Sequence, residues 1–89
     1  MRPVLGYPLW IGTARDARDV RRILDAGIEG VVDLAVEEPP ATLTRELTYL
    51  RFPLLDGSGN PPWLIRAAVT TLAVLVRERV PTLVRAGRG

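Results

Sequence analysis

Two kinds of apolar pattern alternate along this chain, and their alternation restricts its fold more than any other feature of the sequence. Short runs rich in Leu, Ile and Val alternate with segments in which apolar residues recur every three or four positions. The short runs predict strands over residues 9–12, 28–36, 48–55 and 80–84. Because strands that alternate with helices form largely parallel sheets, we expect an α/β sandwich with about four strands and two main helices.

Residues 13–26 predict the first and weaker of the two helices. Their apolar side chains fall on one face of a helix, whereas the Arg and Asp side chains fall mostly elsewhere. Thr13 or Asp16 can supply the N-cap, and Gly27 stands where a left-handed C-cap is expected. We therefore expect this segment to pack one apolar face against the sheet.

Residues 61–79 predict the second and longer helix. Asn60 is a good N-cap residue, and Pro61 follows at the favoured first helical position. Apolar residues surround most of this helix. Such a distribution is typical of a mostly buried helix.

Two helices are few for a parallel sheet, which normally carries helices on both faces. The chain has 89 residues, enough for one small domain spanning residues 1–89. A glycine-containing loop follows the last predicted strand, and such a loop usually leads into a further helix. We therefore expect a truncated domain, with part of its sheet uncovered and available for self-association.

The chain contains neither cysteine nor histidine. These absences exclude disulfides, a thiolate nucleophile and a Ser-His-Asp triad from these residues, and they remove the commonest metal ligand. Glu37 and Glu38 form a carboxylate pair, but no third ligand is evident, and a solvated strand end explains them equally well. We expect neither a metal ion nor a cofactor.

Charge and hydropathy exclude two further classes of partner. The formal net charge is +2, from 12 basic and 10 acidic residues, which is too balanced for a nucleic-acid-binding surface. The longest apolar stretch is residues 67–76, about half the roughly 20 residues that a membrane-spanning helix needs. We therefore expect a cytoplasmic protein that binds neither nucleic acid nor membranes.

The order of several segments resembles a known family. An aromatic–apolar–Gly strand over residues 9–12 and a helix lead into a Val-rich strand that starts with Gly-Ile. Residues 49–56, 61–79 and 80–84 then follow. This order is similar to the N-terminal portion of dual-specificity protein phosphatases, which are cysteine-dependent enzymes. In that family the corresponding segments are the strand that delivers a general-acid Asp, the long helix before the active site, and the strand entering the phosphate loop.

The resemblance implies a particular set of site residues. In the family, a strand ends in His-Cys, and five loop residues and an Arg follow. Asp56 would hold the general-acid position. The remnant of the phosphate loop would be Arg85, Ala86, Gly87, Arg88 and Gly89. The nucleophilic Cys expected after Val84 and the phosphate-binding Arg expected after the loop are both absent.

These implications lead to two hypotheses. By resemblance the partner would be a phosphoprotein or another phosphomonoester, but without a thiolate we expect the chain to be inactive as it stands. The alternative is a non-catalytic small α/β module that binds a partner or self-associates as a homo-oligomer through the uncovered sheet face. Asp56 also suits an ordinary turn before glycine, residues 85–89 suit a basic chain end, and Trp10 and Trp63 suit packing.

Overall fold

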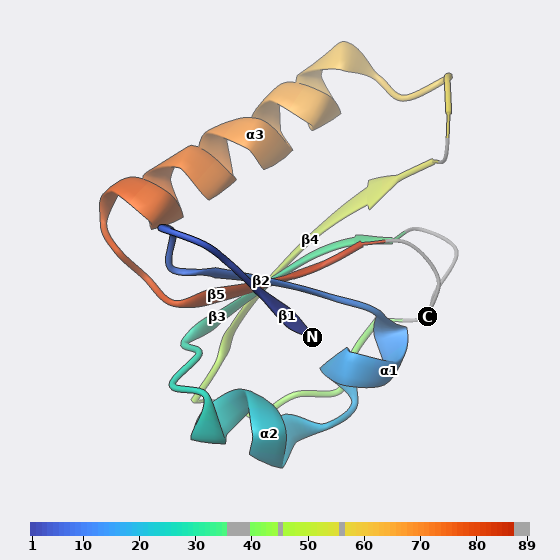
Figure 1. The fold of residues 1–89 in the computed structure, drawn as a ribbon. Coiled ribbons are helices and arrows are strands. Elements are labelled where there is room, and N and C mark those ends of the chain that lie inside the picture. Colours follow the sequence, from blue (N-terminus) through green and yellow to red (C-terminus); the bar gives the residue numbers. More distant parts are fainter. Residues whose placement is uncertain (36–39, 45, 56, 87–89) are drawn as a thin grey trace.

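The computed structural model describes residues 1–35, 40–44, 46–55 and 57–86. They form five strands and three helices (Figure 1). In chain order the elements are β1 (Arg2–Val4), β2 (Leu9–Gly12), α1 (Ala14–Ala17), α2 (Val20–Asp25), β3 (Gly30–Ala35), β4 (Thr48–Leu54), α3 (Pro62–Arg77) and β5 (Thr82–Arg85). The predicted α/β class is confirmed.

The five strands form one sheet in the order β1-β2-β5-β3-β4. Strands β2, β5, β3 and β4 run parallel, and β1 pairs antiparallel with β2. The sequence did not predict β1, because its three residues include Pro3, which interrupts the apolar pattern. An edge strand tolerates proline since one of its sides needs no ladder hydrogen bonds.

The single helix expected over residues 13–26 is two short helices, α1 and α2. Asp19 separates them, because its backbone leaves the helical region and its carboxylate accepts a hydrogen bond from the Arg22 amide at 3.1 Å. Thr13 is the N-cap of α1, and its backbone amide donates to the Asp16 carboxylate at 3.0 Å. The same carboxylate lies 2.9 Å from the Met1 ammonium, which ties the start of β1 to α1.

Helix α3 begins one residue later than expected. Pro61 is the N-cap, and Pro62 takes the first helical position. Asn60 does not cap the helix: its side-chain oxygen accepts from the Leu55 amide at 2.7 Å, and its side-chain nitrogen donates to the Leu55 carbonyl at 2.9 Å. Asn60 therefore closes the loop after β4 rather than starting α3.

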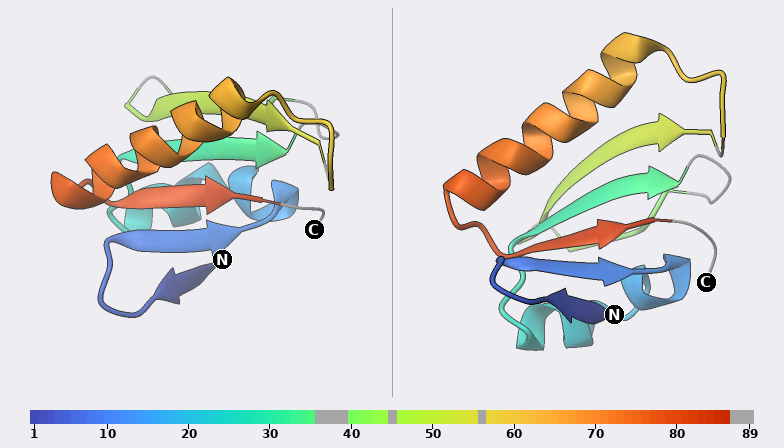
Figure 2. Two further views of the ribbon diagram at one scale, coloured as in Figure 1. Left: turned by 90° about the horizontal axis from the view of Figure 1, so that it is seen from above. Right: turned by 45° about the horizontal axis from the view of Figure 1, so that its top comes forward.

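The sheet separates two helical layers (Figures 1 and 2). Helices α1 and α2 lie on one face, and α3 crosses the other. The main core lies between α2 and the sheet, where five buried side chains cluster: Ile23, Ile28, Val31, Leu47 and Leu83. On the opposite face, Leu64 and Ala68 are the buried residues of α3, so the helix expected to be mostly buried uses only one narrow face.

Gly12 at the end of β2 provides a test of this packing. A Cβ atom there would lie 2.9 Å from Leu83 Cδ1 and 3.1 Å from Asp16 Cβ, closer than packed atoms tolerate. We expect Gly12→Ala to lower the free energy of unfolding by about 1–3 kcal/mol in urea titrations. Gly30→Ala is the matched control, because the nearest atoms there are 3.8 Å away. Equal losses in both variants would contradict this account.

Asp16 predicts a specific acid sensitivity. Burial alone would raise the pKa of Asp16, but hydrogen bonds from the Met1 ammonium and Thr13, with the charge of that ammonium, hold the pKa below 3.8. A carboxyl group whose pKa is lower in the folded state stabilises the fold at pH values above its unfolded pKa. This stabilisation is lost as the pH falls through the folded pKa. We expect Asp16→Asn to cost about 1 kcal/mol at neutral pH and the difference from wild type to vanish in strong acid. A difference that is independent of pH would refute the charge contribution.

Candidate functional site

The carboxyl ends of the parallel strands meet at one edge of the sheet, where open α/β sheets usually bind ligands. The expected phosphate-loop remnant starts at this edge. Arg85 is the last residue of β5, and the Ala86 amide donates to the Gly12 carbonyl at 3.0 Å. Residues 87–89, Asp56, Glu37 and Glu38 lie outside the described residues. The general-acid role of Asp56 and the loop role of residues 85–89 therefore stay predictions.

Arg85 was expected in a loop, but the structure extends β5 by one residue to include it. In the parallel register Arg85 stands opposite Asp33 of β3. Its Nη1 atom donates to Asp33 Oδ2 at 2.8 Å, and both side chains are buried. The positive charge nearest the end of β5 is thus held by a carboxylate of the same sheet.

Tyr49 of β4 extends this ion pair into a network. Its hydroxyl donates to the same Asp33 oxygen and accepts a hydrogen bond from the Ala41 amide at 3.1 Å. Burial, together with the hydrogen bond donated to Asp33 and the charge of that carboxylate, raises the pKa of Tyr49. Tyr49 therefore remains a neutral donor at physiological pH, and the network joins β5, β3, β4 and the segment before β4.

The sequence held a signal for one member of this network. Asp33 interrupts a run of apolar residues in a predicted strand, and a buried carboxylate requires a partner. The identity of the partner was not accessible, because Arg85 lies 52 residues further along the chain. Tyr49 lies in a strand that the sequence predicted, but nothing in the apolar pattern of that strand linked it to Asp33.

The network fits a structural role better than phosphate binding. A guanidinium that recognises phosphate presents its parallel N–H groups to the ligand. Arg85 instead directs a donor at Asp33 inside the sheet. Ala86, the next residue, has no group that could attack phosphorus. At the described end of β5, the structure therefore holds a buried ion pair and no nucleophile.

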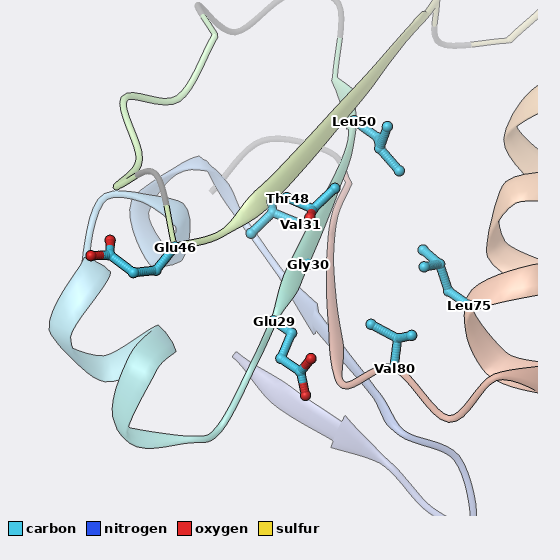
Figure 3. A pocket seen from close by; sticks show the side chains of 8 residues that line it. All are labelled: Glu29, Gly30, Val31, Glu46, Thr48, Leu50, Leu75 and Val80. Atoms are coloured by element: carbon cyan, nitrogen blue, oxygen red, sulfur yellow. The ribbon is translucent and has the colours of Figure 1, made fainter.

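A pocket of about 330 Å³ lies at the opposite edge of the sheet (Figure 3). Gly30 and Thr48, the first residues of β3 and β4, line it together with Leu75 of α3. Glu29 and Glu46 lie at its margin and point away from each other (Figure 3). Two carboxylates disfavour a phosphate anion, so this pocket does not substitute for the expected site.

Two further features are absent from the described ranges. None of the helices there has both the length and the apolar character required to cross a bilayer. Nor do three or more Asp or Glu side chains gather there in a cluster able to hold a metal ion.

The Asp33–Arg85 pair predicts a large difference between single and double variants. We expect Arg85→Met alone to cost about 3–5 kcal/mol in urea-induced unfolding, because it leaves a buried carboxylate without this partner. Combining it with Asp33→Leu removes both charges, and we expect most of the stability to return. Tyr49→Phe, which removes one hydrogen bond, serves as the control at about 1–2 kcal/mol. A double variant as unstable as the sum of the two single variants would contradict the pairing.

Comparisons with known proteins identify the fold. No protein-family model matches the sequence, and no curated protein matches it either. Among solved structures, human DUSP28 superposes with a TM-score of 0.73 at 20% identity, over 93% of this chain and 58% of that one. A mouse putative dual specificity phosphatase, solved with zinc tungstate, superposes with a TM-score of 0.73 at 24% identity, over 92% of this chain and 52% of that one.

These superpositions include nearly all of this chain, whereas the chain spans only a little over half the length of either phosphatase. The resemblance inferred from the order of the sequence segments is thus confirmed at the level of the fold. The chain has the fold of dual-specificity phosphatases, over about half the extent of that fold in the proteins it matches.

Proposed function

We propose that these 89 residues form a non-catalytic module with a phosphatase fold, which does not hydrolyse phosphomonoesters by itself. One observation carries the proposal. The strand that leads into the expected phosphate loop ends in Arg85, which is buried against Asp33, and continues into Ala86. Neither residue can provide a nucleophile to attack phosphorus.

The chemistry explains why the remaining residues do not compensate. Cysteine-dependent hydrolysis begins when a thiolate forms a bond to phosphorus and the alkoxide leaves with a proton from a general acid. The chain contains no cysteine, so the first of these steps lacks its reactant. A general acid at Asp56 would not restore turnover, because it acts only on a leaving group that an attack has displaced.

The fold of the matched proteins supports a phosphoprotein or another phosphomonoester as the ligand class for a complete domain. In this chain, however, the guanidinium of Arg85 is already engaged with Asp33. The expected cytoplasmic location stays a prediction. Binding of a partner protein, the second candidate function, is favoured by the large apolar side chains that α3 exposes.

An assay with a fluorogenic aryl phosphate tests the proposal. We expect the purified chain to show no turnover above buffer and no phosphorylated protein after an acid quench. Circular dichroism must show a folded protein, and an active dual-specificity phosphatase run in parallel shows that the assay detects turnover. Turnover that disappears in Asp56→Asn, or a covalent phosphoprotein adduct, would overturn the proposal.

A further inference from the structure

The pocket at the amino ends of β3 and β4 is bounded on one side by the end of α3 (Figure 3). There the Val80 amide donates to the Leu75 carbonyl at 2.9 Å, and the Arg79 amide donates to the Val76 carbonyl at 3.1 Å. This pair of hydrogen bonds is a Schellman motif, in which an apolar residue just beyond the helix commonly packs against one in its last turn. Leu75 and Val80 hold these two positions, and both line the pocket.

The wall opposite α3 comes from β4. Tyr49 packs against the core on the α2 side of the sheet, so its neighbours Thr48 and Leu50 face α3. In Figure 3 the side chains of Leu50, Leu75 and Val80 point into one space. The cavity of about 330 Å³ is therefore apolar at its centre, with the Thr48 hydroxyl in its wall. Pockets for small molecules have this character and begin at about 300 Å³.

The electrostatic surroundings of the pocket are negative. Glu29, which directly precedes β3, lies at its margin. The pocket also adjoins the carboxyl end of α3, where the helix dipole places partial negative charge. Of the described residues that line the pocket, none is basic; Arg77 and Arg79 at the end of α3 are exposed and do not line it. Glu46 lines the pocket, but its side chain extends away from the apolar centre (Figure 3).

We propose that this pocket binds a primary alkylammonium group, with the alkyl chain between Leu50 and Leu75 and the ammonium beside Glu29. A free alkylamine and the lysine side chain of a partner protein share this chemistry. The apolar walls favour the chain, whereas the carboxylate and the helix end favour a cation and repel an anion. The inference goes beyond the proposed function, because it concerns the opposite edge of the sheet and does not depend on whether the chain hydrolyses phosphate.

Three ligands with one alkyl chain test the ligand class. Hexylammonium, 1-hexanol and hexanoate differ only in the head group, and NMR titrations of the intact chain at low ionic strength measure their affinities. We expect hexylammonium to bind at least about fivefold more tightly than 1-hexanol, and hexanoate to bind most weakly. We expect butylammonium to bind at least about fivefold more weakly than hexylammonium, because it buries two methylene groups fewer. Equal affinities of the amine and the alcohol, or tightest binding of hexanoate, would overturn the proposal.

Three variants locate the bound ammonium. Glu29→Gln removes the charge at the margin, and we expect it to weaken hexylammonium binding at least about threefold while 1-hexanol binding and the melting temperature stay unchanged. Glu46→Gln is the matched control, since that side chain extends away from the cavity. Thr48→Phe fills the cavity, and we expect it to weaken binding of both the amine and the alcohol at least about tenfold. Equal effects of the two glutamine variants, or unchanged binding in a Thr48→Phe protein that circular dichroism shows to be folded, would contradict this site.

A lysine analogue distinguishes the two sources of the ammonium. Nα-acetyl-lysine N-methylamide and butylammonium both carry the ammonium on four carbon atoms, but the analogue adds flanking peptide groups. Equal affinities would support a lysine side chain of a partner protein, and much weaker binding of the analogue would support a free amine. Failure of every ammonium ligand to bind would refute the inference. The aryl phosphate assay is independent of these titrations, so turnover would refute only the proposed function.

Discussion

The buried ion pair between Asp33 and Arg85 joins the two central strands of the sheet. Loss of the ion pair inside the sheet would cost several kcal/mol, so the pair favours the register of β3 and β5 that brings these side chains together. Tyr49 binds the same carboxylate and thereby connects the edge strand β4 to this pair. Because the two partners are 52 residues apart, the network forms only when α3 has returned the chain across the sheet.

This network also determines what the end of β5 can do. In a sheet of this topology, the carboxyl ends of the strands are the usual place for chemistry. Here the basic side chain at that edge is turned into the sheet, where it stabilises the fold. The chain therefore combines the architecture of a phosphatase with an interior ion pair near the expected site. The proposed lack of hydrolysis has a separate cause, which is the absence of cysteine from the chain.

Helices cover the two faces of the sheet unequally. Helices α1 and α2 close a core around Ile23 and Leu83. Of the described helices, only α3 lies on the other face (Figure 2). Its Val69 side chain is 60% exposed.

Local features of the sequence predicted most of the elements. The predicted bounds of strand β2 agree with the structure. The predicted helix over residues 61–79 extends one residue before the start of α3 and two residues beyond its end. The predictions failed where a polar side chain had more than one possible partner. Asn60 was expected to cap α3 but binds Leu55, and Asp19 starts a new helix within a segment predicted as one. Both side chains accept hydrogen bonds from backbone amides, and sequence spacing does not tell which amides are within reach.

Periodicity alone was thus sufficient to predict the α/β class, because the spacing of apolar residues indicates which face of each helix or strand is buried. The absence of cysteine was equally visible without any coordinates. Three-dimensional packing decided that Arg85 belongs to a strand, that Asp33 neutralises it, and that Leu64 and Ala68 are the buried residues of α3. These outcomes depend on contacts between residues far apart in the chain, and no local pattern encodes the distance between two side chains that meet only after the sheet has formed.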